Sequence, residues 1–444
     1  IWWFENDVLM NSDGELVRSM GNSRVIKAPE STEKIRKNAF AGSKADTVIL
    51  PPDQDDLVLE EDCFADSAVQ TVLCHTKKQY EAVEKQIGSS GAGEDIQVEL
   101  MLTSREGFAY SRVNRDGAEI VTLLTAPENI REFDGTVTAE DGSPVTLTAI
   151  GDNAFAGCEA LQWVTLPESV SRIGYQAFRN CTSLEGLLID AREEIHMGNK
   201  SLDGCYSLRF VASNARRGER EDDYAPVISD SYGVSTHENY YFYVPSNPEG
   251  YGSTCVAFEA SDDVEEYRMV SIGGDGRMLY GVGKDGDTWL ALRSGLQVAE
   301  QVKLPEDTLE MYRYAMADTR TASGESYTVN WDELPTLKYL DAGVFKNASL
   351  GGMVTIRDAS LGDEVFNHCT RVRELHFPGT MKYLGSAVFG NCSSLEKIYM
   401  GNTTGGYGTV SLMVGEFTGC DSLRELHFEA LYERRQRIPA HPRS

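Results

Sequence analysis

A short phrase built around phenylalanine recurs along this chain of 444 residues and limits how the chain can fold. The copies read NAFAGCEALQWVTLP from Asn153, QAFRNCTSLEGLLID from Gln176, EVFNHCTRVRELHFP from Glu364, AVFGNCSSLEKIYMG from Ala387 and GEFTGCDSLRELHFE from Gly415. The interval from Phe155 to Phe178 is 23 residues, and the interval from Phe366 to Phe389 is 23 again. A fixed period in the low twenties is typical of a solenoid, in which one coil stacks on the next.

Apolar residues fall at the third, sixth and eighth positions after the cysteine of each copy, as in Leu161, Val164 and Leu166. The last two alternate with an outward residue, which is the pattern of a half-buried strand. Proline often follows, as at Pro167 and Pro378, and is expected to end the strand because it offers no N–H group. One coil cannot bury its own apolar face, but stacked coils can. We therefore predict a curved leucine-rich-repeat solenoid, mostly β with short helical turns and with parallel strands on one face.

The stretch from Ile150 to Cys181, IGDNAFAGCEALQWVTLPESVSRIGYQAFRNC, resembles the BspA-like (Treponema pallidum-type) leucine-rich repeats almost letter for letter. Weaker copies lie at Phe40, Phe64, Leu202, Met316 and Phe345. The resemblance implies a bacterial cell-surface or secreted protein. It also implies adhesion, with a host or bacterial surface protein, or a glycan, as the macromolecular partner.

The chain is strongly acidic, with 41 Lys and Arg residues against 69 Asp and Glu residues and a net charge of −28. Such a surface argues against a nucleic-acid partner or an anionic membrane, which require basic patches. No apolar run approaches the roughly 20 residues that a membrane helix needs, so we expect no membrane insertion within this chain. The chain begins at Ile1 rather than Met, so the lack of a targeting segment carries no conclusion. Nothing in the sequence indicates an oligomeric state.

The chain has nine cysteines, and six of them share one register three residues after the phenylalanine position: Cys158, Cys181, Cys205, Cys369, Cys392 and Cys420. Equivalent positions in neighbouring coils lie about 4.8 Å apart with parallel Cβ directions. That spacing exceeds the usual Cβ separation of a disulfide, about 3.5–4.5 Å. We therefore predict six reduced, inaccessible thiols that pack as small apolar groups. Cys63, Cys74 and Cys255 lie outside this register, and no pairing is proposed for them.

Three Asp-Gly turns between apolar runs, in 7–18, 109–124 and 268–282, predict a hairpin before each block of repeats. Thr76 and Gly88 are expected to cap a helix with Tyr80, Val83 and Ile87 on one face, followed by a flexible connector. We therefore predict the following segments: 1–104, a hairpin, the first repeat block and the helix with its connector; 105–215, a hairpin and the second block; 216–267, a charged and then Tyr-rich irregular insert; 268–430, a meander and the third block; and 431–444, a basic tail.

The motifs of known catalytic chemistry are absent or weak. Gly281 to Gly286 matches GxGxxG, but the DGDTWLAL that follows predicts a turn and a strand rather than the helix of a nucleotide site. The excess of acidic residues would let two carboxylates meet by chance, yet no spacing favours a glycosidase-like pair. We therefore predict no catalytic residues, no cofactor and no metal site.

The outward strand positions, fifth and seventh after each cysteine, are the candidate binding residues. In the third block they form two columns, one Glu–Lys–Glu and one His–Tyr–His: Glu374, His376, Lys397, Tyr399, Glu425 and His427. They are either a polar and aromatic ligand strip or a solvated face whose charges pair weakly. A zinc site is disfavoured, because His376 and His427 start two coils, about 10 Å, apart.

In the second block, the outward positions include an apolar stripe of Trp163, Leu188 and Phe210. Either the insert or a hairpin of this chain covers the stripe, or a partner does; packing against the insert is the first expectation. If the third-block strip is not the binding site, the Tyr-rich segment around Tyr240, Tyr241 and Tyr243 is the next candidate.

Three functions remain open at this point. The first is a non-enzymatic binding or adhesion scaffold that uses the outward face of its stacked strands. The second is a structural spacer within a larger surface protein, and the third is an enzyme or enzyme accessory.

Overall fold

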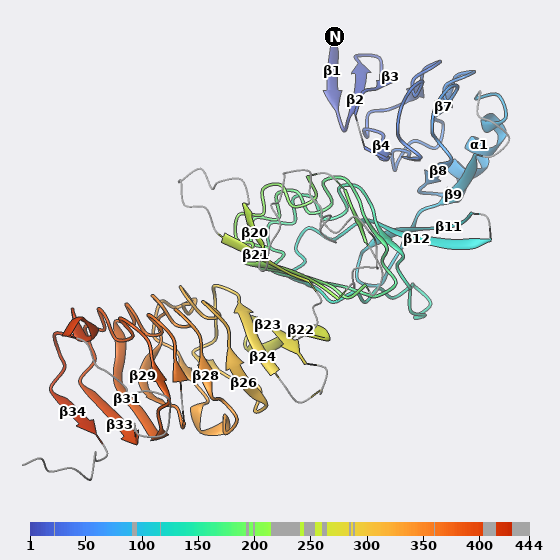
Figure 1. Cartoon of the computed structure of the whole chain (residues 1–444). Coiled ribbons are helices and arrows are strands. Elements are labelled where there is room, and N and C mark those ends of the chain that lie inside the picture. The colour runs from blue at the N-terminus through green and yellow to red at the C-terminus, as the bar shows by residue number, and fades with distance from the viewer. Residues whose placement is uncertain are drawn as a thin grey trace, which may run out of the picture. The chain divides into compact units, whose positions relative to one another are not determined.

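A computed structural model describes residues 1–21, 23–90, 96–115, 117–191, 195–198, 200–214, 240–243, 254–259, 264–283, 286, 289–358, 360–402 and 414–428. The chain divides into two compact units, Ile1–Glu259 and Ala260–Ser444. In each unit, coils stack side by side and their strands run in parallel ladders (Figure 1). The predicted basic tail and most of the predicted insert lie outside the described residues, and the other predicted boundaries remain predictions.

The first block opens with the predicted hairpin, in which β2 pairs antiparallel with β3. Its strands are β1 (Trp2–Glu5), β2 (Val8–Asn11) and β3 (Glu15–Ser19). Parallel coils follow, with longer strands on one side: β4 (Val25–Lys27), β6 (Thr47–Ile49), β8 (Thr71–Cys74) and β9 (Gln97–Leu100). The other side continues the hairpin sheet with β5 (Lys34–Ile35) and β7 (Val58–Leu59).

The helix α1 (Lys77–Ile87) confirms the predicted capping. The Thr76 hydroxyl accepts a hydrogen bond from the backbone N–H of Gln79 at 3.0 Å, and Gly88 follows the last turn. Val83 is buried, and Tyr80 and Ile87 pack partly against the core of the first block. The sequence analysis missed Gln79, which is fully buried because its amide donates to the carbonyl oxygens of Pro51 and Gln54. The connector 91–95 lies outside the described residues.

The second block has the same plan, with a hairpin and two ladders. One sheet contains β10 (Leu102–Thr103), β11 (Ala109–Arg115), β12 (Ala118–Thr125), β14 (Ala149–Ile150), β16 (Arg172–Ile173) and β18 (His196–Met197). The other contains β13 (Glu132–Phe133), β15 (Trp163–Leu166), β17 (Gly186–Ile189), β19 (Phe210–Ser213), β21 (Thr254–Glu259) and β20 (Tyr240–Tyr243). The insert is therefore not wholly irregular, because β20 and β21 extend this sheet.

The third block begins with the antiparallel meander of β22 (Glu266–Gly273), β23 (Gly276–Val282) and β24 (Trp289–Ser294). The GxGxxG segment joins β23 to β24, as predicted, although Lys284 and Asp285 lie outside the described residues. Short strands extend this sheet: β26 (Thr308–Met311), β28 (Tyr339–Leu340), β30 (Ser360–Leu361) and β32 (Tyr383–Leu384). Between them lie β25 (Gln301–Val302), β27 (Thr328–Val329) and the 3-10 turn η1 (Trp331–Glu333).

The longer strands of the third block form the sheet that carries the candidate residues. In order they are β29 (Gly351–Thr355), β31 (Arg371–Thr380), β33 (Lys397–Asn402) and β34 (Glu425–Phe428), with the 3-10 turn η2 (Val414–Phe417) before the last. The strand β15 ends just before Pro167, as predicted. The same prediction for Pro378 is wrong, because β31 runs through it. The register between β31 and β33 shifts between Phe377 and Thr380, which lets the ladder accommodate a residue without an N–H.

Two parallel ladders, rather than the one that was predicted, hold each stack of coils. The second ladder consists mostly of two-residue strands such as β14 and β16, which pair in parallel. It arises from the apolar residue that precedes a recurring glycine of the repeat, such as Ile150 and Ile173, both of which are fully buried. The core therefore lies between two sheets.

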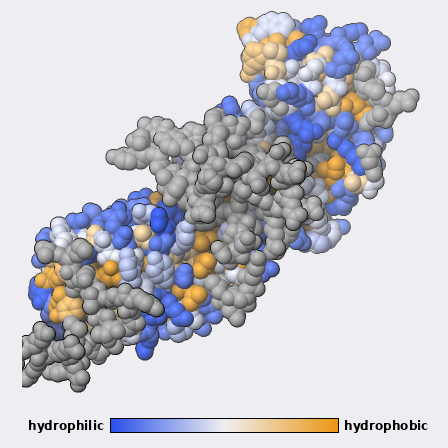
Figure 2. Space-filling view, in the orientation of Figure 1, coloured by the Kyte–Doolittle hydropathy of each residue, from blue (hydrophilic) through white to orange (hydrophobic). Residues whose placement is uncertain are grey.

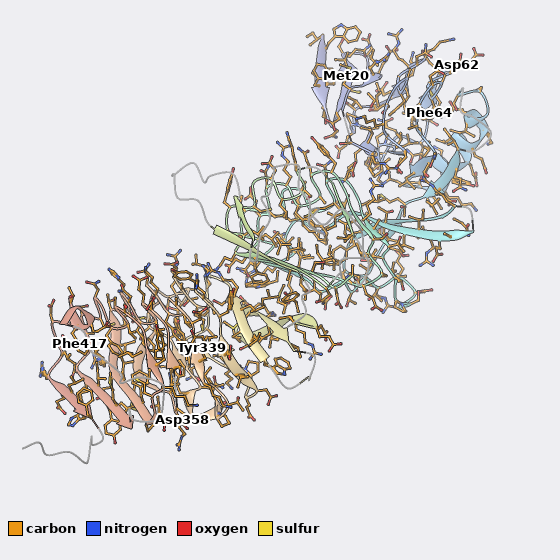
Figure 3. The ribbon with its side chains drawn as sticks, in the orientation of Figure 1. Met20, Asp62, Phe64, Tyr339, Asp358 and Phe417 are labelled. Atoms are coloured by element: carbon orange, nitrogen blue, oxygen red, sulfur yellow. The ribbon has the colours of Figure 1, made fainter. Side chains whose placement is uncertain are left out.

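Within each block, phenylalanines stack in a column between the ladders, and among the described residues this column is buried except at the partly buried Phe417. The ring centroids of Phe155 and Phe178 lie 4.9 Å apart with an interplanar angle of 16°. Phe345 and Phe366 repeat this contact at 5.8 Å. Figure 3 labels one member near each end of the chain, Phe64 in the first block and Phe417 in the last. Since aromatic groups bury a large apolar area, this column accounts for much of the core energy.

Most phenylalanine turns have two residues in the left-handed region, one two positions before the ring and one two positions after it; the turn at Phe417 has only the second, Gly419. Around Phe155 these are Asn153 (φ 58°) and Gly157 (φ 79°), and around Phe389 they are Ala387 (φ 53°) and Asn391 (φ 59°). Glycine and asparagine tolerate this region, which explains the recurring NAF and GC or NC letters. Alanine does not, so Ala387 is locally strained.

We expect Ala387→Gly to raise the free energy of unfolding by about 1 kcal/mol, because glycine adopts a positive φ without a Cβ penalty. Chemical denaturation of the purified chain measures the change. Ala156→Gly is the control, since Ala156 is an exposed residue of the same kind of turn without a positive φ. An Ala387→Gly variant that is less stable than the parent would contradict this account of the turn.

The six cysteines of the register are free thiols, and all are buried except the half-buried Cys420. The prediction of an inaccessible thiol is therefore wrong at Cys420, which lies in the last coil of the described residues, where no further described coil covers it. Five of the thiols also hydrogen-bond to the phenylalanine carbonyl of the preceding coil, as from Cys181 Sγ to Phe155 O at 3.1 Å. Burial raises the pKa of Cys369 to about 12, so this thiol stays protonated and can donate.

Candidate binding face

The structure brings the six predicted residues together on one sheet. Glu374 lies directly opposite Lys397, and Lys397 lies opposite Glu425. His376 lies opposite Tyr399, and Tyr399 lies opposite His427. The inward residues between these columns, Leu375 and Ile398, are fully buried, so the sheet is anchored to the core. We call these six residues the third-block strip.

The side chains of the strip engage one another. His376 Nε2 lies 3.2 Å from Glu374 Oε2, and His427 Nε2 lies 3.0 Å from Glu425 Oε2. Lys397 Nζ lies 3.5 Å from Glu425 Oε1. The ring of His376 stacks on that of Tyr399, with centroids 6.0 Å apart. Lys397 therefore pairs with Glu425, whereas Glu374 contacts His376.

The neighbours of Glu425 favour the charged form of its carboxyl group. The hydrogen bond from His427, and then the charge of Lys397, hold the pKa of Glu425 below its ordinary value. The side chains of Lys397, Glu425 and His427 are 41%, 46% and 58% exposed. These ion pairs are solvent-screened and weak, so they orient the strip rather than stabilise the fold.

An apolar side chain lies beside the strip, which the sequence analysis did not anticipate. Met353 in β29 is the strand partner of Glu374 and is 54% exposed. The outward position of Met353 could not be assigned from the sequence, because the β29 coil departs from the repeat pattern. It has Gly351 and Gly352 where other coils have larger residues. The strip therefore combines charge, aromatic rings and one flexible apolar group.

The last strand also differs from the prediction at its inward positions. Leu426 and Phe428 were expected in the core, yet they are 40% and 47% exposed. They belong to β34, which is the edge of the sheet among the described residues, so no described strand covers them.

The equivalent face of the second block is closed. Trp163, Leu188 and Phe210 are buried, with at most 4% of each exposed. The rings of Trp163 and Phe210 stack 6.4 Å apart across Gly186, where a Cβ would overlap the Phe210 ring. This stripe is therefore not an open surface. The insert that we expected to cover it lies largely outside the described residues, and the side chains of Tyr240, Tyr241 and Tyr243 lie outside them too.

The equivalent face of the first block is closed by the second. Its outward residues Ile49 and Leu73 form a buried cluster with Leu124 of β12. Lys27 Nζ donates to Thr125 Oγ1 at 2.7 Å across the same junction. Among the described residues, the outward positions of β31, β33 and β34 are half-buried or exposed, whereas Ile49 and Leu73 of the first block are buried.

A second exposed apolar group lies on the hairpin of the first block. Ile1, Trp2 and Phe4 are 91%, 58% and 66% exposed. Figure 2 shows orange and pale atoms over β1, at the tip of this block. The strand β1 is also the edge of its sheet among the described residues.

The described residues contain no cluster of three or more histidine, cysteine or acidic side chains that could hold a metal ion. Their helices include none that is long and apolar enough to cross a bilayer.

Comparison with protein families identifies the architecture. The model of the BspA type leucine rich repeat region matches in six copies, over residues 18–85, 133–216, 299–411 and 338–435. These segments cover more than half of the 444 residues. The chain belongs to the BspA-type leucine-rich repeat family, which confirms the predicted class of solenoid.

Several solved structures are similar to this chain. A leucine rich cell surface protein from Faecalibacterium prausnitzii is 15% identical, with 97% of this chain and 95% of that one covered and a TM-score of 0.34. A leucine-rich repeat protein from Bacteroides ovatus is 18% identical, with 72% of this chain and 75% of that one covered and a TM-score of 0.28. The pneumococcal vaccine antigen PcpA is 12% identical, with 73% of this chain and 93% of that one covered and a TM-score of 0.26. Such values carry no argument about function. No curated protein matches this chain.

Proposed function

We propose that this chain is a non-enzymatic binding scaffold of a bacterial surface or secreted protein, and that it holds a protein partner on the third-block strip. The observation that carries the proposal is the contrast between equivalent faces. The apolar outward residues of the first and second blocks, such as Leu73 and Trp163, are buried, whereas side chains of the strip such as His427 and Glu425 are about half exposed. The membership of the repeat family supports a scaffold, and the surface location rests on that resemblance.

The chemistry of the strip suits a protein with both charged and apolar groups. Tyr399 offers apolar area and a hydroxyl together, which is why tyrosine is enriched where interfaces concentrate their energy. Lys397 is already oriented by Glu425, so a carboxylate of the partner meets an ammonium group that has lost part of its freedom. Met353 adds an adaptable apolar contact beside them.

We expect the double variant Lys397→Ala, Tyr399→Ala to weaken partner binding at least about tenfold, since two central side chains are truncated. The partner is first captured from surface proteins of host and bacterial cells by the immobilised full chain, and the affinity is then measured by surface plasmon resonance.

The matched control is Lys382→Ala, Tyr383→Ala. This pair is also a lysine followed by a tyrosine, and both residues are exposed. They lie at the short-strand ladder, where Lys382 directly precedes β32 and Tyr383 is its first residue. Affinity that falls only in the control would overturn the proposal. Unchanged affinity in both variants would move the site elsewhere, with Tyr240, Tyr241 and Tyr243 tested next. If no protein is captured by the parent chain, the proposal also fails, and the structural spacer becomes the better description.

A further inference from the structure

A cavity of about 350 Å³ lies in the first unit, where the first repeat block meets the second. One wall is the outward face of β4, β6 and β8, and the other is the hairpin β11–β12 with the short strands β14 and β16. Small-molecule sites occupy roughly 300–1,000 Å³, so this cavity has room for a ligand the size of one sugar ring. Three guanidinium groups line it, from Arg24, Arg115 and Arg172.

The acidic groups of this cavity are already engaged. Asp46 pairs with the guanidinium of Arg24. The Asp152 carboxylate, whose side chain is fully buried, accepts hydrogen bonds from the backbone N–H groups of Arg24 and Val25 and, at 2.8 Å, of Tyr175. Glu119 pairs with Arg112, at 3.3 Å. Asp152 keeps its charge, because its hydrogen-bond donors are neutral, and it forms the ion pair with Arg172. None of the three carboxylates pairs with Arg115.

The guanidinium group of Arg115 forms no ion pair with a carboxylate of the described residues, and that of Arg172 forms only a long one with Asp152. Arg115 Nη2 donates to the neutral hydroxyl of Thr71 at 2.8 Å. Arg172 Nη2 lies 3.8 Å from Asp152 Oδ1, which is too far for a hydrogen bond. Burial, followed by the repulsion of Arg24, lowers the pKa of Arg172. Arg115 is therefore the guanidinium group of this cavity that is left without a carboxylate partner among the described residues.

Hydroxyl groups stand on the same wall as Arg115. Ser111 and Thr122 are cross-strand partners in β11 and β12, and both line the cavity. Ser111 is buried, and neither hydroxyl has a hydrogen-bond partner among the described residues. Each is thus available to a polar ligand.

We propose that this cavity binds a small oxyanion that also carries hydroxyl groups, of the size of a uronic acid or a sugar phosphate. Arg115 and Arg172 take the carboxylate or phosphate group, because a guanidinium matches the geometry of either through two parallel hydrogen bonds. Ser111 and Thr122 take the ligand hydroxyls. Arg24, whose side chain is 50% exposed, marks the side on which the cavity meets solvent. This site is independent of the third-block strip.

Isothermal titration calorimetry of the full chain at low salt tests the proposal, with glucuronate, glucose 1-phosphate and neutral glucose as the probes. We expect one or both anions to bind saturably and glucose to bind at least about tenfold more weakly, because the charge-assisted hydrogen bonds are lost. The double variant Arg115→Gln, Arg172→Gln should lose at least about tenfold in affinity for the anion. Binding by only one of the anions identifies its acidic group as the one that the site selects.

Arg179→Gln is the matched control, since Arg179 is an exposed residue of a phenylalanine turn in the same block and does not line the cavity. If the double variant does not fold, Ser111→Ala provides the second test, with an expected loss of several-fold. The proposal is overturned if neither anion gives a saturable heat with the parent chain, or if the variants bind as tightly as the control.

Discussion

Replacement of Phe178 by alanine is expected to lower the free energy of unfolding by about 3–5 kcal/mol. Phe178 is fully buried and stacks on Phe155 at 4.9 Å, so its truncation leaves a cavity between two coils that are held by backbone hydrogen bonds. The loss combines the transfer of the ring with the missing packing contacts. Chemical denaturation followed by circular dichroism measures the change.

Phe4→Ala is the control for this experiment, because Phe4 is 66% exposed and its truncation should change stability by less than about 0.5 kcal/mol. If Phe178→Ala lowered the free energy of unfolding by less than about 1 kcal/mol, the buried phenylalanine column would not be a main source of stability.

Replacement of Asp152 by alanine is expected to cost about 2–4 kcal/mol, because buried donors on both blocks lose their acceptor. The carboxylate receives the backbone N–H groups of Arg24 and Val25 from the first block and of Tyr175 from the second. Gly174 makes this possible, since a Cβ there would overlap Asp152. Denaturation gives the loss, and hydrogen exchange at residues 24 and 25 reports whether it lies at the junction.

Glu159→Ala is the matched control, since Glu159 is an exposed acidic residue seven positions further along the chain. Slow exchange that persists at residues 24 and 25 in the Asp152→Ala variant would show that the two blocks do not depend on this carboxylate.

The repeat and its orientation could be predicted because each coil encodes its own geometry. The phenylalanine, the cysteine and the alternating strand residues recur at fixed spacing, and Asp-Gly marks the hairpins. The register of the strip followed from the same spacing, so Glu374, Lys397 and Glu425 fall opposite one another. The second ladder was missed because two-residue strands carry too little periodicity to be distinguished from loop.

The closure of the first-block face depended on contacts between residues far apart in the chain, which no local pattern contains. A signal was nevertheless present. The strands TVI and TVLC around Ile49 and Leu73, and GLLI in β17, are continuous apolar runs, whereas KIYM in β33 and ELHF in β34 alternate. A continuous run indicates burial on both faces. This difference in pattern could therefore have distinguished the buried strands of the first and second blocks from β33 and β34 of the third.

Hydroxyl-radical footprinting of the free chain, read residue by residue by mass spectrometry, tests the central claim most directly. That claim is that equivalent outward positions are open in the third block and closed in the second. We expect the half-buried Tyr399 and His376 and the exposed His427 to be oxidised clearly faster than Trp163 and Phe210, which are buried and should be strongly protected. Oxidation of Trp163 as readily as of Tyr399 would contradict the claim and remove the reason for placing the partner on the third-block strip.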